Sequence, residues 1–91
     1  MNIEYLKTLE VYWQETDPDD DQARYEHFDS ITELIEDEAV FARLAESSDY
    51  DELGDKVYDF MNLEYRWKVG ELLDLSIRDP VADKYLYVLE T

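Results

Sequence analysis

Residues 63–69 read Leu-Glu-Tyr-Arg-Trp-Lys-Val, and the interpretation of this stretch decides the predicted fold. Its apolar residues alternate strictly with charged ones, which is the pattern of a half-buried β-strand. Its Tyr65 and Val69, however, also continue with Leu72 along one face of a helix. The tail is apolar at every position from Tyr85 to Leu89 and rich in strand formers, so residues 84–90 offer a partner to a strand at 63–69. An α+β fold with this hairpin is therefore the alternative to an all-α fold.

The rest of the chain favours helices. Only two glycines and two prolines are present, too few turn formers for a many-stranded β-sandwich. Four helices are predicted before the ambiguous region, over 3–15, from 17 to about 28, over 30–46 and over 49–61. With a fifth in the last third, we predict an all-α bundle of about five helices that forms a single acidic helical domain over 1–91.

Capping residues set the predicted helix starts. Asp17 before Pro18 matches an N-cap followed by the first helical position, where proline is tolerated. Ser30 and Asp49 are each followed three residues later by Glu, as in a capping box. Gly54 is expected to weaken the fourth helix slightly. The residues predicted to be buried at helical spacing are Ile3, Leu6, Leu9, Trp13, Ile31, Leu34, Ile35, Phe41, Leu44, Leu53, Val57, Phe60 and Met61.

Charge is the strongest functional signal in this sequence. Twenty-five acidic and eight basic residues give a net charge of −17. Residues 15–59 hold 17 of the acids against three bases, a net −14. Such a field attracts cationic partners, repels nucleic acid and anionic membranes, and weakens with salt. We therefore expect a basic protein as the partner, no direct binding to nucleic acid or membrane, and stability that rises with added salt.

Composition bounds the class of protein. Apolar residues make up 45% and aromatic residues 14% of the chain, so it is predicted to fold despite its charge. The chain has no cysteine, which excludes disulfides and thiolate zinc sites and agrees with a reducing compartment. No signal-like or membrane-spanning stretch is evident. A cytoplasmic protein is expected.

The acidic run after residue 16 resembles the start of a calcium-binding loop only in spacing. Asp17, Asp19 and Asp21 alternate as in an EF-hand, but Gln22 and Phe28 stand where that loop needs Gly and a bidentate Glu. A solvated turn is the better interpretation, and no metal site is predicted.

Catalytic chemistry is not predicted either. His27 is the only histidine and stands beside Glu26 and Asp29, so it is expected to be a lone exposed side chain. The chain has no phosphate-binding loop, nucleophile elbow or activated cysteine. We expect no enzyme activity and no cofactor.

Rows of carboxylates are the predicted functional surface. In a helix over 49–61, Asp51, Asp55 and Asp59 fall at i, i+4 and i+8, and a second row is predicted in the helix before it. Like charges at this spacing destabilise a helix by roughly 0.2 to 0.5 kcal/mol per pair, and a plain solubility coat would mix both signs. The predicted partner-binding residues are the two rows, the acidic run and two tyrosine anchors: Asp17, Asp19, Asp20, Asp21, Tyr25, Glu33, Glu36, Asp37, Tyr50, Asp51, Asp55 and Asp59.

Such rows resemble a phosphate backbone in their charge. In composition and charge pattern the chain resembles the DNA-mimic inhibitors of phages and mobile elements, such as anti-restriction and anti-CRISPR proteins. The resemblance implies an inhibitor that occupies the nucleic-acid-binding surface of a DNA- or RNA-handling protein. One alternative is an immunity protein or antitoxin against a basic toxin. Another is a structural or adaptor protein with a solubilising acidic surface, forming a homodimer through Trp13, Trp67 and the carboxy-terminal third.

Overall fold

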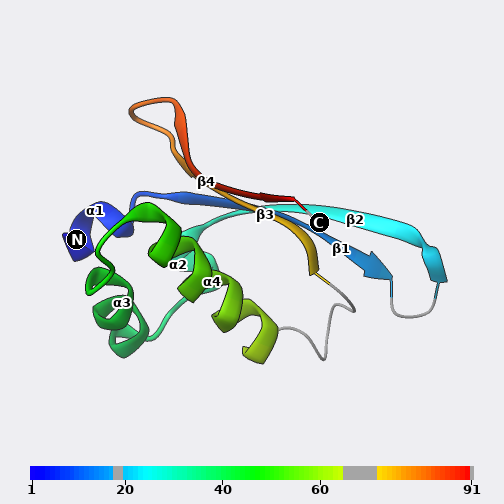
Figure 1. Ribbon diagram of the computed structural model, residues 1–91, viewed down its shortest axis with the longest axis horizontal. Helices are drawn as coiled ribbons and strands as arrows, with labels where there is room; N and C mark the ends of the chain where they lie inside the picture. The colour runs from blue at the N-terminus through cyan, green and yellow to red at the C-terminus, as the bar shows by residue number, and fades with distance from the viewer. Residues whose placement is uncertain (18–19, 65–71, 91) are drawn as a thin grey trace.

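The computed structural model describes the backbone of residues 1–17, 20–64 and 72–90, and the side chains of 1–16, 26–62 and 74–89. Within these ranges a four-stranded antiparallel sheet of order β2-β1-β3-β4 carries the helices on one face (Figure 1). The elements are α1 (Ile3–Leu6), β1 (Glu10–Asp17), β2 (Asp20–Ser30), α2 (Ile31–Leu34), α3 (Glu38–Ala45), α4 (Tyr50–Glu64), β3 (Leu72–Asp79) and β4 (Lys84–Glu90). The predicted all-α bundle is wrong, and the fold is α+β.

The first predicted helix, over 3–15, is mostly a strand. Only α1 is helical, and β1 follows it. Val11, Trp13 and Glu15 are buried while Tyr12 and Gln14 between them are not, so burial in β1 has a period of two. Valine and the aromatic residues suit a pleated surface better than a helix. The apolar residues before β1 follow helical spacing only through α1 and the turn after it.

The second predicted helix, from 17 to about 28, is the strand β2. Asp17 pairs with Asp20 and Thr16 with Arg24, so the chain reverses here and forms an antiparallel hairpin with β1. Asp and Pro are common in turns as well as at helix starts, which explains the wrong prediction. Pro18 and Asp19 lie outside the described residues.

The third predicted helix, over 30–46, is split in two. α2 ends after one turn because Ile35 is extended, with φ −122° and ψ 115°. Asp37 then caps α3, its Oδ1 accepting a hydrogen bond from the Ala39 amide at 2.8 Å. Ser30 makes no capping hydrogen bond through its side chain, so the predicted capping box is absent. Glu33, Glu36 and Asp37 consequently do not form a row on one helix.

The fourth predicted helix is confirmed as α4. Leu53, Val57 and Met61 are buried on its inner face, whereas Phe60 is only partly buried. No helix in the described ranges is both long and apolar enough to cross a bilayer.

The alternative α+β prediction had the correct class. In the described structure β4 pairs with β3, with Leu75 opposite Leu89. Of the stretch 63–69, the first two residues belong to α4 and the others lie outside the described part of the chain.

A turn joins β3 to β4 at Asp79-Pro80, the second Asp-Pro sequence in the chain. Asp79 Oδ1 accepts hydrogen bonds from the amides of Val81 at 2.9 Å and Ala82 at 3.0 Å, and Asp79 Oδ2 accepts one from the Tyr5 hydroxyl at 2.8 Å. Asp83 adopts a left-handed conformation, with φ 55°, which Asp tolerates better than most residues. The same Asp-Pro sequence that suits a helix start here builds a tight turn.

The core lies between the sheet and the helices. Residues paired across antiparallel strands share one face of a sheet. On the helix-covered face Val11 pairs with Ile77, and Ile77 pairs with Tyr87. The buried apolar residues are Leu6, Leu9, Val11, Trp13, Ile31, Leu34, Ile35, Val40, Phe41, Leu44, Leu53, Val57, Met61, Leu75 and Ile77. Trp13 is therefore core rather than a self-association face, and Trp67 lies outside the described residues.

None of the described helices covers the opposite face of the sheet, here called the open face (Figure 1). Its central row crosses all four strands, since Phe28 pairs with Tyr12, Tyr12 with Ser76, and Ser76 with Val88. The Tyr12 and Phe28 rings lie 4.5 Å apart between centroids. This face therefore presents apolar groups to solvent.

Candidate protein-binding site

The predicted carboxylate row on α4 is present. Asp51, Asp55 and Asp59 are all exposed and follow one another at one-turn intervals, a rise of about 6 Å per step. We call these three residues the α4 acidic row. None of the ion pairs among the described side chains includes a member of this row.

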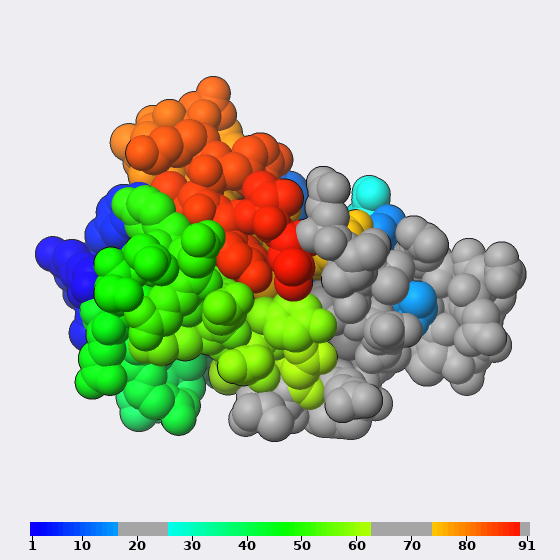
Figure 2. Space-filling view, in the orientation of Figure 1, coloured from blue at the N-terminus to red at the C-terminus, as the bar shows by residue number. Residues whose placement is uncertain are grey.

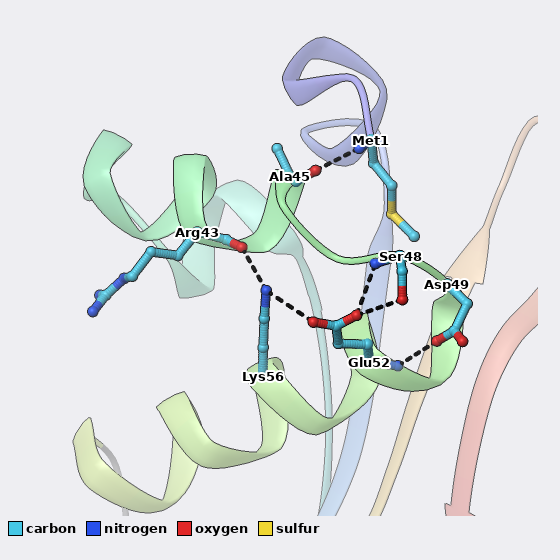
Figure 3. Close-up of polar contacts among 7 residues, drawn as sticks. All are labelled: Met1, Arg43, Ala45, Ser48, Asp49, Glu52 and Lys56. Carbon is cyan, nitrogen blue, oxygen red and sulfur yellow. Dashed lines mark hydrogen bonds and ion pairs between the residues drawn. The ribbon is translucent and has the colours of Figure 1, made fainter.

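The start of α4 is fixed by a network of hydrogen bonds (Figure 3). Asp49 Oδ1 accepts from the Glu52 amide at 2.8 Å, and Glu52 Oε2 accepts from the Ser48 amide at 2.8 Å and from its hydroxyl at 2.7 Å. These hydrogen bonds from Ser48 lower the pKa of Glu52. The predicted cap at Asp49 is thus confirmed, and Glu52 serves structure rather than the exposed acidic surface.

Lys56 is turned toward α3 (Figure 3). Its Nζ donates to the Arg43 carbonyl at 2.9 Å and lies 3.5 Å from Glu52 Oε1. Lys56, Arg43 and Asp59 all line a groove of about 390 Å³ between α3 and α4. Two cations therefore share the groove with Asp59, while Asp51 and Asp55 remain the uncompensated part of the row.

The middle of α4 packs directly on β4 through Gly54. A Cβ at Gly54 would overlap the ring of Tyr87, so the absence of a side chain lets the strand approach the helix. The Tyr87 hydroxyl donates to Asp55 Oδ1 at 3.4 Å. Burial, followed by the nearby Asp55 carboxylate, raises the pKa of Tyr87. Gly54 was predicted only to weaken α4. In the structure it lets β4 pack against the helix, where Tyr87 contacts Asp55 of the acidic row.

β4 supplies apolar groups beside this row. It is the last strand in the sheet order, and Figure 2 shows it at the surface beside α4. Tyr85 is 59% and Val88 54% exposed, whereas Tyr87 between them faces α4. Acidic and apolar groups thus lie on the two sides of one edge strand. This combination favours binding to a protein, because charge steers encounter and apolar anchors supply contact energy.

The other predicted site residues are not gathered here. Asp17, Asp20, Asp21 and Tyr25 lie on the backbone of the β1–β2 hairpin, and Asp19 lies outside the described residues. Sheet order places β2 at the edge opposite β4, so these residues are separated from the α4 acidic row by two strands.

The second predicted row is dispersed. Glu33 lies in α2, Glu36 in the connection that follows, and Asp37 at the α3 cap. Tyr50 begins α4, is 39% exposed and lines a hollow beside Tyr5.

His27 is neither alone nor fully exposed, contrary to prediction. Its Nε2 lies 2.7 Å from Glu15 Oε1, and its ring stacks on Trp13 with centroids 4.9 Å apart. Glu15 is 5% exposed, and its Oε2 has no hydrogen-bond partner among the described residues. The pair joins β1 to β2 on the side of the sheet that carries Val11 and Trp13. It adds no member to the exposed site.

Tyr85, Val88 and the Gly54–Tyr87 contact were missed by sequence reasoning. The run of strand formers at 84–90 signalled a strand. Its position at the sheet edge depends on strand order, which the run itself does not encode.

No protein-family model matches this chain, and comparison with curated proteins and with solved structures also finds no match. The geometry of α4 and β4 is therefore the main indication of function.

Proposed function

We propose that this protein is a non-enzymatic acidic inhibitor that binds the nucleic-acid-binding surface of a basic DNA- or RNA-handling protein in the cytoplasm. The observation that carries the proposal is the α4 acidic row, in which Asp51 and Asp55 are exposed with no cationic side chain paired to them in the described structure. A regular series of negative charges meets the requirement of a surface built to hold phosphates.

The overall charge supports the same proposal. A net charge of −17 favours rapid encounter with a basic surface and opposes binding to nucleic acid itself. On the helical layer Lys7 pairs with Glu38 at 2.7 Å and Lys56 with Glu52, and the exposed Arg43 is the one other basic side chain described there. Negative potential on this layer is therefore left largely uncancelled.

The groove between α3 and α4 supports binding rather than catalysis. Its polar lining consists of Arg43, Lys56, Glu46 and Asp59, without a histidine or a hydroxyl nucleophile. Lysine and carboxylates can also act as acids, bases or nucleophiles, but only beside a partner that activates them, and Lys56 is instead held by the Arg43 carbonyl and Glu52. The proposed inhibitor acts by occupying a surface.

Exposed apolar groups on β4 favour a second candidate, an immunity protein or antitoxin against one basic toxin. Tyr85 and Val88 offer side-chain anchors that a pure phosphate mimic does not need. The two candidates differ in whether DNA competes with this protein for its target.

The test is affinity capture from cells of the native host with three proteins. One is the wild type, and the second carries Asp51→Asn, Asp55→Asn and Asp59→Asn. The third is a matched control with the same change in charge at exposed acids of β2 and the α2 region: Glu26→Gln, Glu33→Gln and Glu36→Gln.

Capture of a nucleic-acid-binding protein by the wild type and the control, its loss with the α4 variant, and its release by added DNA would support the proposal. Equal loss with both variants would mean that only net charge matters. Capture that DNA does not reverse would favour the toxin-binding candidate instead.

A further inference from the structure

β4 leaves one edge of the sheet without a neighbouring strand in the described structure. An edge strand presents unpaired N–H and C=O groups that pair readily with another extended chain. The atoms of β4 reach the surface beside α4 in Figure 2. Its seven residues, Lys84–Glu90, are a normal strand length. The edge is therefore long enough to accept a further strand.

Common protections of an edge strand are few in β4. Proline is absent from the strand, and its one lysine, Lys84, stands at the beginning. The irregular pairing that bends it lies where Ile77 pairs with Tyr87 and Arg78 with Tyr85, so Leu86 has no opposite residue. From Tyr87 onward the pairing is regular. This second half of β4 is the part best suited to accept a strand.

The two sides of this edge differ in chemistry. On the helix side, the Asp55 carboxylate lies next to Tyr87, and Asp51 precedes Asp55 by one helical turn. On the open face, Val88 and Tyr85 are exposed. Successive residues of a strand point to opposite faces. A strand added here would therefore place alternate residues against carboxylates and against apolar groups.

We propose that the partner adds an extended basic segment to β4 as a fifth strand, with Lys or Arg facing Asp51 and Asp55 and apolar residues facing Val88 and Tyr85. This inference rests on the proposed function, since it describes how the same basic target is held. Main-chain hydrogen bonds supply affinity in this mode of binding, and the alternating side chains supply specificity.

A second copy of this chain is the competing occupant of the edge, and charge argues against it. Each copy carries a net charge of −17. Pairing β4 with β4 would also bring two α4 acidic rows toward one interface, where like charges oppose association. A basic segment removes that repulsion and replaces it with attraction.

The experiment uses three synthetic peptides of identical composition in Lys and Val. The first alternates the two residues, the second groups them in two blocks, and the third alternates them but carries N-methyl groups on every second amide. Affinity for the full-length protein is measured by fluorescence anisotropy at low salt, and amide exchange of β4 is followed by NMR. Sedimentation of the protein alone gives its oligomeric state.

We expect the alternating peptide to bind about tenfold more tightly than either control peptide, because only it forms the ladder of hydrogen bonds with both faces matched. It should slow amide exchange in 87–90. Asp51→Asn with Asp55→Asn should weaken its binding several-fold, while Glu33→Gln with Glu36→Gln changes it much less, because α2 lies against β2 at the other edge.

Equal binding of all three peptides would overturn strand addition while leaving the charge-based function intact. Failure of all three to bind at low salt would overturn both. A dimer whose β4 amides are protected without peptide would also overturn the inference, because a second copy would then occupy the edge.

Discussion

Replacing Gly54 with alanine should destabilise the protein, although the same change in an ordinary helix stabilises it. Alanine in a helix interior is favoured over glycine by about 1 kcal/mol. Here the added Cβ would overlap ring atoms of Tyr87, including Cγ at the base of the side chain. A small rotation of the Tyr87 ring would not relieve this overlap. Either the Tyr87 side chain must change its position or β4 must move away from α4.

The magnitude follows from what the displacement removes. Tyr87 is half-buried against the core, and overpacking or loss of such a contact costs about 2 to 3 kcal/mol. Subtracting the gain in helix propensity leaves a net loss of about 1 to 2 kcal/mol for Gly54→Ala. For a domain of this size, each kcal/mol lowers the melting temperature by about 4 to 8 °C.

Urea unfolding of four proteins tests this account: the wild type, Gly54→Ala, Tyr87→Ala and the double variant. With the ring removed, Gly54→Ala should become stabilising by about 0.5 to 1 kcal/mol, because only helix propensity remains. The reversal of sign is the diagnostic result. If Gly54→Ala stabilises the protein that retains Tyr87, then β4 does not approach α4 as closely as described above.

Two further predictions concern charge. Hydrogen bonds from the Ala82 amide and then from the Tyr5 hydroxyl lower the pKa of Asp79. The ionised carboxylate of Asp79 therefore stabilises the fold fully at pH values above the ordinary pKa of Asp. This stabilisation is lost as the pH falls through the lowered pKa. Asp79→Asn should therefore melt at a lower temperature than the wild type at pH 7, and the difference in melting temperature should shrink below about pH 4. A difference that does not change with pH would show that the charge of Asp79 does not stabilise the fold. Raising NaCl from about 20 to 500 mM should raise the melting temperature of the wild type, and less so after Asp51→Asn, Asp55→Asn and Asp59→Asn. The Glu26→Gln, Glu33→Gln, Glu36→Gln control should keep more of the salt effect, and an equal reduction in both variants would show that the α4 acids do not interact as a row.

Local signals in the sequence were sufficient for α4. The cap at Asp49 and the spacing of Leu53 and Val57 lie within a few residues of one another, and the helix they predict is present. Exposure of the α4 acidic row followed directly from that helix. This part of the candidate site was therefore predictable.

The strands were not predicted correctly because they depend on pairing between segments far apart in the chain. Val11 and Trp13 fit a helical pattern with the residues before them, yet Val11 pairs with Ile77 and Trp13 with Leu75 in the sheet. Those contacts join segments more than sixty residues apart, so no local pattern records them. The strand order they produce also makes β4 an edge and places Tyr85 beside the acids.

The pairing of β1 with β3 also has a consequence for how the chain reaches its native state. Glu10 lies opposite Arg78, a separation of 68 residues, so the central pair of the sheet closes a loop that is long for so small a domain. Contacts so distant in sequence slow folding, because the entropy of loop closure is lost before the contact forms. During synthesis, β1 and its hairpin partner must wait for β3 to leave the ribosome. Until then the inner strand β1 is itself an unprotected edge, and the chain is most vulnerable to aggregation at a strand that later lies inside the sheet.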